Sequence, residues 1–283
     1  MDPSAILLSV LVLGGVGVVF GSLIALANKH LKVWEDPRID AVVGLLPGSN
    51  CGACGFAGCR AFAEGLVGGK SQPAGCTNMG PDQVQAVAGY LGVAAGTAVK
   101  RVARLLCAGG THVAAQQAEY AGLPTCSAAA AVAGGGKGCS WGCLGLGDCD
   151  RACTFHAIEM NEHGLPVVEP DRCTACGDCV EACPKDLFVL MPMAQKLIVQ
   201  CKSALVGEAA ESLCKVACTA CGRCVDDAPP GLIRIRNGLA VVDYARNDLA
   251  RPEVTRRCPT GAIVWVEHAQ LAPSREPAGS ASR

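Results

Sequence analysis

The sequence predicts an α+β fold in which one membrane-spanning helix precedes a series of small units built around cysteine. Three observations lead to this expectation. Residues 5–27 carry no charged side chain, twenty of the 283 residues are cysteine, and much of the chain after residue 100 is an internal repeat. Cysteine at about 7% is high for a chain of this length, so the spacing of the cysteines decides between disulfides and metal sites.

The apolar run "AILLSVLVLGGVGVVFGSLIALA" predicts a transmembrane helix. Its 23 uncharged residues span about 34 Å as a helix, against a hydrocarbon core of about 30 Å. A cleaved signal peptide is the alternative, because Ala25–Ala27 resembles a cleavage site, but the run is long and the leader contains Asp2. Lys29 and Lys32 follow the run, so we expect a single-pass protein of the bacterial inner membrane with all later residues in the cytoplasm.

Composition and motifs exclude several functions. The formal charge is −1 with both signs interspersed, which does not favour nucleic-acid binding. No G-x-G-x-x-G follows an expected strand, so no dinucleotide site is expected in this chain. The apolar run offers no charged residue for an ion path.

The first cysteine group is Cys51, Cys54, Cys59 and Cys76, with the spacing C-x₂-C-x₄-C-x₁₆-C. Such a set can bind zinc or a [4Fe–4S] cluster. The residues between these cysteines are small, which lets the backbone approach cluster sulfides and favours the cluster. A short helix is expected from Arg60 to Val67.

The membrane helix followed by "WEDPRIDAVVGLLPGSNCGACGFAGC" resembles the B subunit of the Rnf complex, up to about residue 265. That family forms a membrane ferredoxin:NAD oxidoreductase coupled to ion transport. The resemblance implies other membrane subunits as partners. It also implies an anchor, a four-cysteine cluster domain and ferredoxin domains within this chain.

The repeat consists of four half-motifs that begin at Cys153, Cys183, Ala228 and Cys258. Each has an apolar residue five positions later, where we expect a strand to begin. The hairpins "GLPVVEPDRC" and "GLAVVDYARN" align without a gap. These features predict two tandem copies of a bacterial-type two-cluster ferredoxin fold.

In that fold, the fourth cysteine of one motif binds the cluster of the other motif. In the first copy, this rule assigns one [4Fe–4S] cluster to Cys153, Cys173, Cys176 and Cys179. The first motif of this copy has Leu146 at its middle position, and Cys139 is available instead. We therefore assign the other cluster to Cys139, Cys143, Cys149 and Cys183, the alternative being a three-cysteine [3Fe–4S] site.

In the second copy, one ligand set is intact and consists of Cys218, Cys221, Cys224 and Cys258. The other set is replaced throughout by Ala228, Asn247, Ala250 and Glu253. This copy is therefore expected to hold a single cluster, which gives about four [4Fe–4S] clusters in the chain.

Cys107, Cys126, Cys201 and Cys214 remain unassigned. The spacing Cys126-x₁₂-Cys139-x₃-Cys143 recurs as Cys201-x₁₂-Cys214-x₃-Cys218, so their placement is not random. Buried, inert cysteines in a repeated βα element are one interpretation. A further metal site or a redox-active pair is the other.

These assignments predict six segments. They are an anchor at residues 1–28, a four-cysteine domain at 29–88, a linker at 89–104, a two-cluster ferredoxin domain at 105–196, a single-cluster ferredoxin domain at 197–268 and a disordered tail at 269–283. Residues 90–100 of the linker are rich in Gly and Ala, so they form either a flexible connection or a short packed helix.

Sixteen thiolates saturate four clusters and leave no open iron, so we expect one-electron transfer rather than substrate conversion by this chain. The resemblance implies reduced soluble ferredoxin as the donor and a ferredoxin:NAD⁺ oxidoreductase coupled to Na⁺ or H⁺ transport. Two alternatives remain: an electron-transfer subunit that reduces an iron–sulfur transcription sensor, and a zinc-bound interaction protein.

Overall fold

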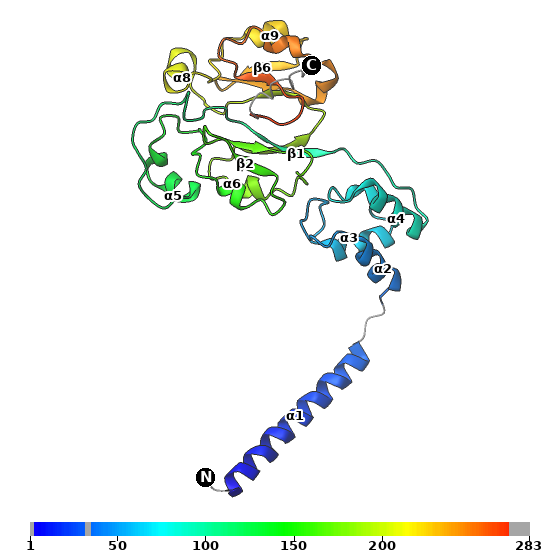
Figure 1. Cartoon of the computed structure of the whole chain (residues 1–283). Helices are drawn as coiled ribbons and strands as arrows, with labels where there is room; N and C mark the ends of the chain where they lie inside the picture. Colours follow the sequence, from blue (N-terminus) through cyan, green and yellow to red (C-terminus); the bar gives the residue numbers. More distant parts are fainter. Residues whose placement is uncertain (1–2, 32–34, 272–283) are drawn as a thin grey trace, which may run out of the picture.

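The computed structural model describes residues 3–31 and 35–271 and begins with the expected apolar helix (Figure 1). Helix α1 is Pro3–Leu31, which corresponds to about 44 Å of helix. Its segment Val10–Lys29 is long and apolar enough to cross a membrane, and none of it is buried.

A small helical region follows, built from α2 (Pro37–Leu45), α3 (Cys59–Val67), the 3-10 turn η1 (Pro73–Gly75) and α4 (Pro81–Leu91). Asp36 caps the N-terminus of α2, because its side-chain carboxylate accepts a hydrogen bond from the backbone N–H of Arg38. The core is small, with Val42, Phe62 and Val87 almost fully buried. Helix α3 confirms the short helix expected after the first cysteine group.

Two β regions follow, and each contains two antiparallel strand pairs. In the first, β1 (Arg101–Leu105) pairs with β4 (Phe188–Pro192), and β2 (Ile158–Met160) pairs with β3 (Pro166–Val168). In the second, β5 (Leu197–Val199) pairs with β8 (Ile263–Trp265), and β6 (Ile233–Arg236) pairs with β7 (Leu239–Val242). Both regions therefore join their first strand to their last and enclose a hairpin between them.

Short helices fill the connections. The first region contains α5 (Cys126–Ala131), η2 (Ala133–Gly136), α6 (Asp148–Arg151) and α7 (Asp178–Glu181). The second contains α8 (Gly207–Leu213), α9 (Arg223–Asp227), η3 (Tyr244–Leu249) and η4 (Pro252–Thr255). Figure 1 shows the two regions side by side, with β1 leading out of the helical region.

The strand starts predicted from the repeat are confirmed. Strands β2, β4, β6 and β8 begin five residues after Cys153, Cys183, Ala228 and Cys258, respectively. The third residue after each of these positions has a left-handed backbone, at His156, Asp186, Gly231 and Gly261. The same sharp turn into the strand is therefore built four times, even where the cysteine is absent.

Two segment boundaries differ from the sequence-based ones. Residues 101–104, assigned to the linker, lie in β1 because Arg101 pairs with Pro192. The assigned tail begins as packed chain: Gln270 is buried, accepts the N–H of Leu105 at 3.0 Å and donates to its carbonyl at 2.6 Å. The rest of the predicted disordered tail, residues 272–283, lies outside the described residues.

Gln270→Ala is expected to lower the free energy of unfolding by about 1–3 kcal/mol, because it leaves the buried N–H and C=O of Leu105 without partners. Gln117→Ala, at an exposed side chain, is the control and should change stability by less than about 0.5 kcal/mol. Thermal or denaturant unfolding measures both. Equal stability of the two variants would contradict the packed start of this segment.

Candidate metal centres

The first cysteine group lies in the helical region. Cys59 begins α3, Cys76 directly follows η1, and three of the four cysteines pack against the core of this region. The side chain of Asn50 accepts the N–H of Cys59 at 2.8 Å, which fixes the loop before α3. Burial raises the pKa of Cys76, and the nearby thiols of Cys54 and Cys51 raise it further. Cys51 and Cys54 thus lie near Cys76, and Cys59 packs against the same core.

Cys153, Cys173, Cys176 and Cys179 line one cavity of about 320 Å³ in the first β region. Cys179 lies on α7, and Cys153 precedes the turn into β2. The N–H of Ala157 donates to the Cys153 sulfur at 3.3 Å. Burial and the three neighbouring thiols raise the pKa of Cys179 to about 12, so four thiolates without a metal are disfavoured here.

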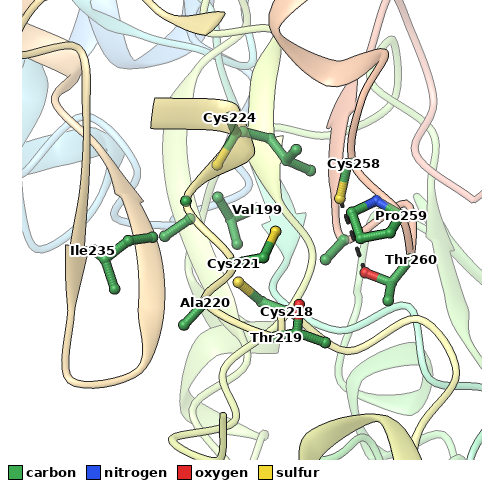
Figure 2. Close-up of a pocket in the computed structure, with 14 residues that line it drawn as sticks. Val199, Cys218, Thr219, Ala220, Cys221, Cys224, Ile235, Cys258, Pro259 and Thr260 are labelled. Carbon is green, nitrogen blue, oxygen red and sulfur yellow. Dashed lines mark hydrogen bonds between the residues drawn. The ribbon is translucent and has the colours of Figure 1, made fainter. Parts of the chain in front are cut away.

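Cys218, Cys221, Cys224 and Cys258 line a second cavity of about 350 Å³, in the second β region. Figure 2 shows their four sulfurs around a shared space, with Cys224 on α9 and Cys258 from the chain before β8. Burial and the other three thiols raise the pKa of Cys224 to about 11. The sequence-based set, including the distant Cys258, is again assembled.

A third cavity, of about 360 Å³, differs in one residue from the sequence-based ligand set. It is lined by Cys126, Cys143, Cys149 and Cys183, whereas Cys139 is not among its lining residues. Cys126 is the first residue of α5, where Thr125 caps the helix by accepting the N–H of Ala128. Burial raises the pKa of Cys149, with further contributions from the thiols of Cys143, Cys126 and Cys183. Cys126 thus occupies the place that the sequence-based assignment reserved for Cys139.

The repeat also argues against Cys139 as a substitute for the middle ligand. Cys139 precedes Cys143 by four residues, and Cys214 precedes Cys218 by four residues in a motif that already has all its cysteines. A cysteine at this position is therefore not a substitute for a missing middle ligand. By the same spacing Cys126 corresponds to Cys201, so it is the cavity lining and not the repeat that singles out Cys126.

The replaced ligand set of the second copy lies where side chains fill the space. Ala250 and Val254 are buried, and Ala228 packs against the same core. The hydroxyl of Tyr244 donates to the Leu197 carbonyl at 2.9 Å, and burial raises the pKa of Tyr244 to about 12. Glu253 is exposed. These residues, apart from Glu253, form part of a packed core.

The spacing of the sulfurs tests which metal group fits. One zinc ion with Zn–S bonds of about 2.3 Å holds its thiolates about 3.8 Å apart. Among residues 3–31 and 35–271, no three cysteine sulfurs lie within 4.8 Å of one another. A cluster of several irons and sulfides holds its thiolates farther apart than a single ion does, so the groups fit a [4Fe–4S] cluster better than zinc.

A buried cation gives a second test. Arg104, on β1, is fully buried, and its Nη1 donates to the His268 carbonyl at 2.7 Å. Its Nε and Nη2 have no partner among the described residues, and neither has the buried hydroxyl of Thr174. Burial lowers the pKa of Arg104, whereas the neighbouring Cys173 thiolate acts to raise it. A buried cation requires a nearby negative charge, which a thiolate-bound cluster supplies.

Comparisons with known proteins identify iron–sulfur regions in two parts of the chain. A family model for an Fe–S cluster matches residues 46–77, and a model for a 4Fe-4S dicluster domain matches residues 139–187. The B subunit of the Na⁺-translocating ferredoxin:NAD⁺ oxidoreductase complex of Acetobacterium woodii is 45% identical over 262 residues, which cover 92% of this chain and 78% of the relative.

Two further relatives show the same likeness. The B subunit of the proton-translocating ferredoxin:NAD⁺ oxidoreductase complex of Clostridium ljungdahlii is 38% identical, over 92% of each chain. The chain belongs to the B-subunit family of ion-translocating oxidoreductase complexes. A third member, from Methanosarcina acetivorans, is 37% identical over 86% of this chain and 92% of the relative. The B-subunit resemblance seen in the sequence is confirmed, and so are multiple 4Fe-4S clusters.

Removal of iron is expected to abolish the cooperative unfolding transition of the two β regions, because their cores contain the cysteines themselves. Anaerobic chelation followed by calorimetry measures this. The transition should return after reconstitution with iron and sulfide. A metal-free protein that unfolds at the original temperature would contradict a structural role for the metal centres.

Proposed function

We propose that this chain is the membrane-anchored electron-transfer subunit of an ion-translocating ferredoxin:NAD⁺ oxidoreductase complex, and that it accepts electrons from reduced ferredoxin. The observation that carries the proposal is the presence of three cavities, each lined by four cysteines, beside a further cysteine group in the helical region. When bound, [4Fe–4S] clusters accept and release single electrons.

The proposed ligand sets combine the sequence motifs with the cavities. They are Cys51, Cys54, Cys59 and Cys76; Cys126, Cys143, Cys149 and Cys183; Cys153, Cys173, Cys176 and Cys179; and Cys218, Cys221, Cys224 and Cys258. The common strand topology of the two β regions supports tandem ferredoxin folds, the second with one cluster site replaced by core side chains.

The groups lie close enough to form a path. The thiols of Cys149 and Cys179, from different groups of the first β region, interact electrostatically. The hydroxyl of Thr77 donates to the Thr174 carbonyl at 2.6 Å, and Cys76 and Cys173 line the same cleft. The group in the helical region therefore adjoins the group of Cys173. The path of electrons would therefore run between the cysteine groups of the first β region and the group in the helical region that follows α1.

We further propose that the cysteine groups lie on the cytoplasmic side. The supporting feature is Lys29 at the end of the apolar segment of α1, since basic residues flank membrane helices on that side. The anchor would hold the helical region near the membrane subunits of the complex. The relatives are named for two different ions, Na⁺ and the proton, so the coupled ion is one of these two.

Ferredoxin-dependent NAD⁺ reduction in membranes tests the function. Membranes that lack this chain are expected to lose the activity, and wild-type chain supplied in trans should restore it. Retained activity together with derepression of redox-regulated genes would overturn the proposal and favour reduction of an iron–sulfur transcription sensor. Colourless protein with stoichiometric zinc would favour an interaction protein instead.

Cys258→Ser is expected to remove one cluster, or about four irons per chain, because Cys258 completes the group on α9. Ala228→Cys is the matched variant and should leave the iron content unchanged, because the rest of that ligand set is replaced. Anaerobic iron and sulfide determination measures both. A gain of iron in Ala228→Cys, or no loss in Cys258→Ser, would contradict the assignment.

A further inference from the structure

Four cysteines remain outside the four groups: Cys107, Cys139, Cys201 and Cys214. They form two pairs related by the repeat. Cys107 and Cys201 each lie two residues after the first strand of their β region, β1 and β5. Cys139 and Cys214 each lie four residues before the first cysteine of a motif. Each β region thus contributes the same two positions.

The backbone brings the two pairs together. The N–H of Ala108 donates to the Gln200 carbonyl at 3.1 Å, which places Cys107 and Cys201 on adjoining segments. The N–H of Ala115 donates to the Leu213 carbonyl, and the Ala115 carbonyl accepts the N–H of Gly138, both at 2.9 Å. Residue 115 therefore joins the segments that carry Cys214 and Cys139.

The side chains converge as well. A Cβ atom on Gly109 would lie 3.0 Å from the Cys214 sulfur and 3.7 Å from the Cys107 sulfur. Cys201 and Cys214 pack in the same buried cluster. The Cys139 thiol lies within electrostatic range of Cys107 and of Cys214. Because residue 109 is glycine, no side chain occupies the space beside the sulfurs of Cys107 and Cys214.

A buried lysine marks the site as anionic. Lys137 is 9% exposed, and its ammonium donates to the carbonyls of Gly109 at 2.5 Å and Cys143 at 2.6 Å. In the part of the chain that the structure describes, no carboxylate pairs with it. Burying a charge without compensation is costly. Thiolates that bind a metal cluster would provide the compensating negative charge.

We propose that Cys107, Cys139, Cys201 and Cys214 bind a fifth [4Fe–4S] cluster at the boundary between the two β regions. Each thiol gives up its proton as its sulfur binds iron. A single zinc ion is disfavoured by the same spacing argument as at the other groups. Inert burial does not account for the buried Lys137 ammonium, which has no carboxylate partner among the described residues.

The position gives the site a role, and this part rests on the proposed function. The Cys107 sulfur accepts the N–H of Cys143 at 3.4 Å, so it adjoins the group of the first β region. The Cys201 thiol lies within electrostatic range of the Cys218 thiol, so it adjoins the group of the second β region. The site therefore lies between the cysteine groups of the two β regions, where a cluster would connect them for electron transfer.

Anaerobic iron and sulfide determination on the reconstituted full chain tests the site. Five clusters require about 20 irons per chain, whereas four require about 16. Each of the variants Cys107→Ser, Cys139→Ser, Cys201→Ser and Cys214→Ser is expected to lose about four irons. The double variant Cys139→Ser/Cys214→Ser should lose the same amount of iron, about four atoms per chain, because both residues bind the same cluster. Ser212→Ala, on the exposed face of α8, is the control and should lose none.

The opposing outcomes are distinct. About 16 irons in the wild-type chain would overturn the proposed site. This measurement needs no variant, so the test remains decisive even if a variant fails to fold. Full iron in Cys214→Ser would show an inert cysteine. Loss of different electron paramagnetic resonance signals in Cys126→Ser and Cys139→Ser is expected, and loss of the same signal overturns the site. If the site fails while NAD⁺ reduction still depends on the chain, the proposed function stands.

Discussion

The structure depends on holding four cysteine sulfurs around one centre from segments that are far apart in the chain. The strands are only three to five residues long and form isolated two-stranded pairs, which are marginal on their own. Cysteines contribute directly to both β cores, where Cys149, Cys153 and Cys179 pack in one and Cys218 and Cys224 in the other. The metal centres thus take much of the place of an ordinary hydrophobic core.

Charge follows from the same constraint. Thiolates bound to a cluster leave net negative charge in the interior of the protein. Buried cations lie near these centres and compensate that charge. Arg104 lies beside Cys173 with two unpaired nitrogen atoms, and Lys137 reaches the loop that carries Cys143. Neither cation has a carboxylate partner among the described residues. In a metal-free protein these groups would be costly, so their presence argues for occupied centres.

The internal repeat keeps the same turn and strand whether or not a cysteine precedes them. The turns after Ala228 and Cys258 retain their left-handed residues and their strands, although only one of the two positions keeps its cysteine. In place of the lost ligands, Ala250, Val254 and Tyr244 contribute to the core.

The sequence by itself predicted the apolar N-terminal helix, the strand starts of the repeat and two four-cysteine sets that each line one cavity. These features depend on local spacing: an uncharged run, a fixed distance from cysteine to strand, and motif cysteines close together in the chain. Only the tertiary structure placed Cys126, rather than Cys139, in the cavity of Cys143, because the path of the chain through α5 brings this more distant cysteine to it. It also brought Cys107 near Cys214, since their proximity arises from the contact between the two β regions and has no local signature.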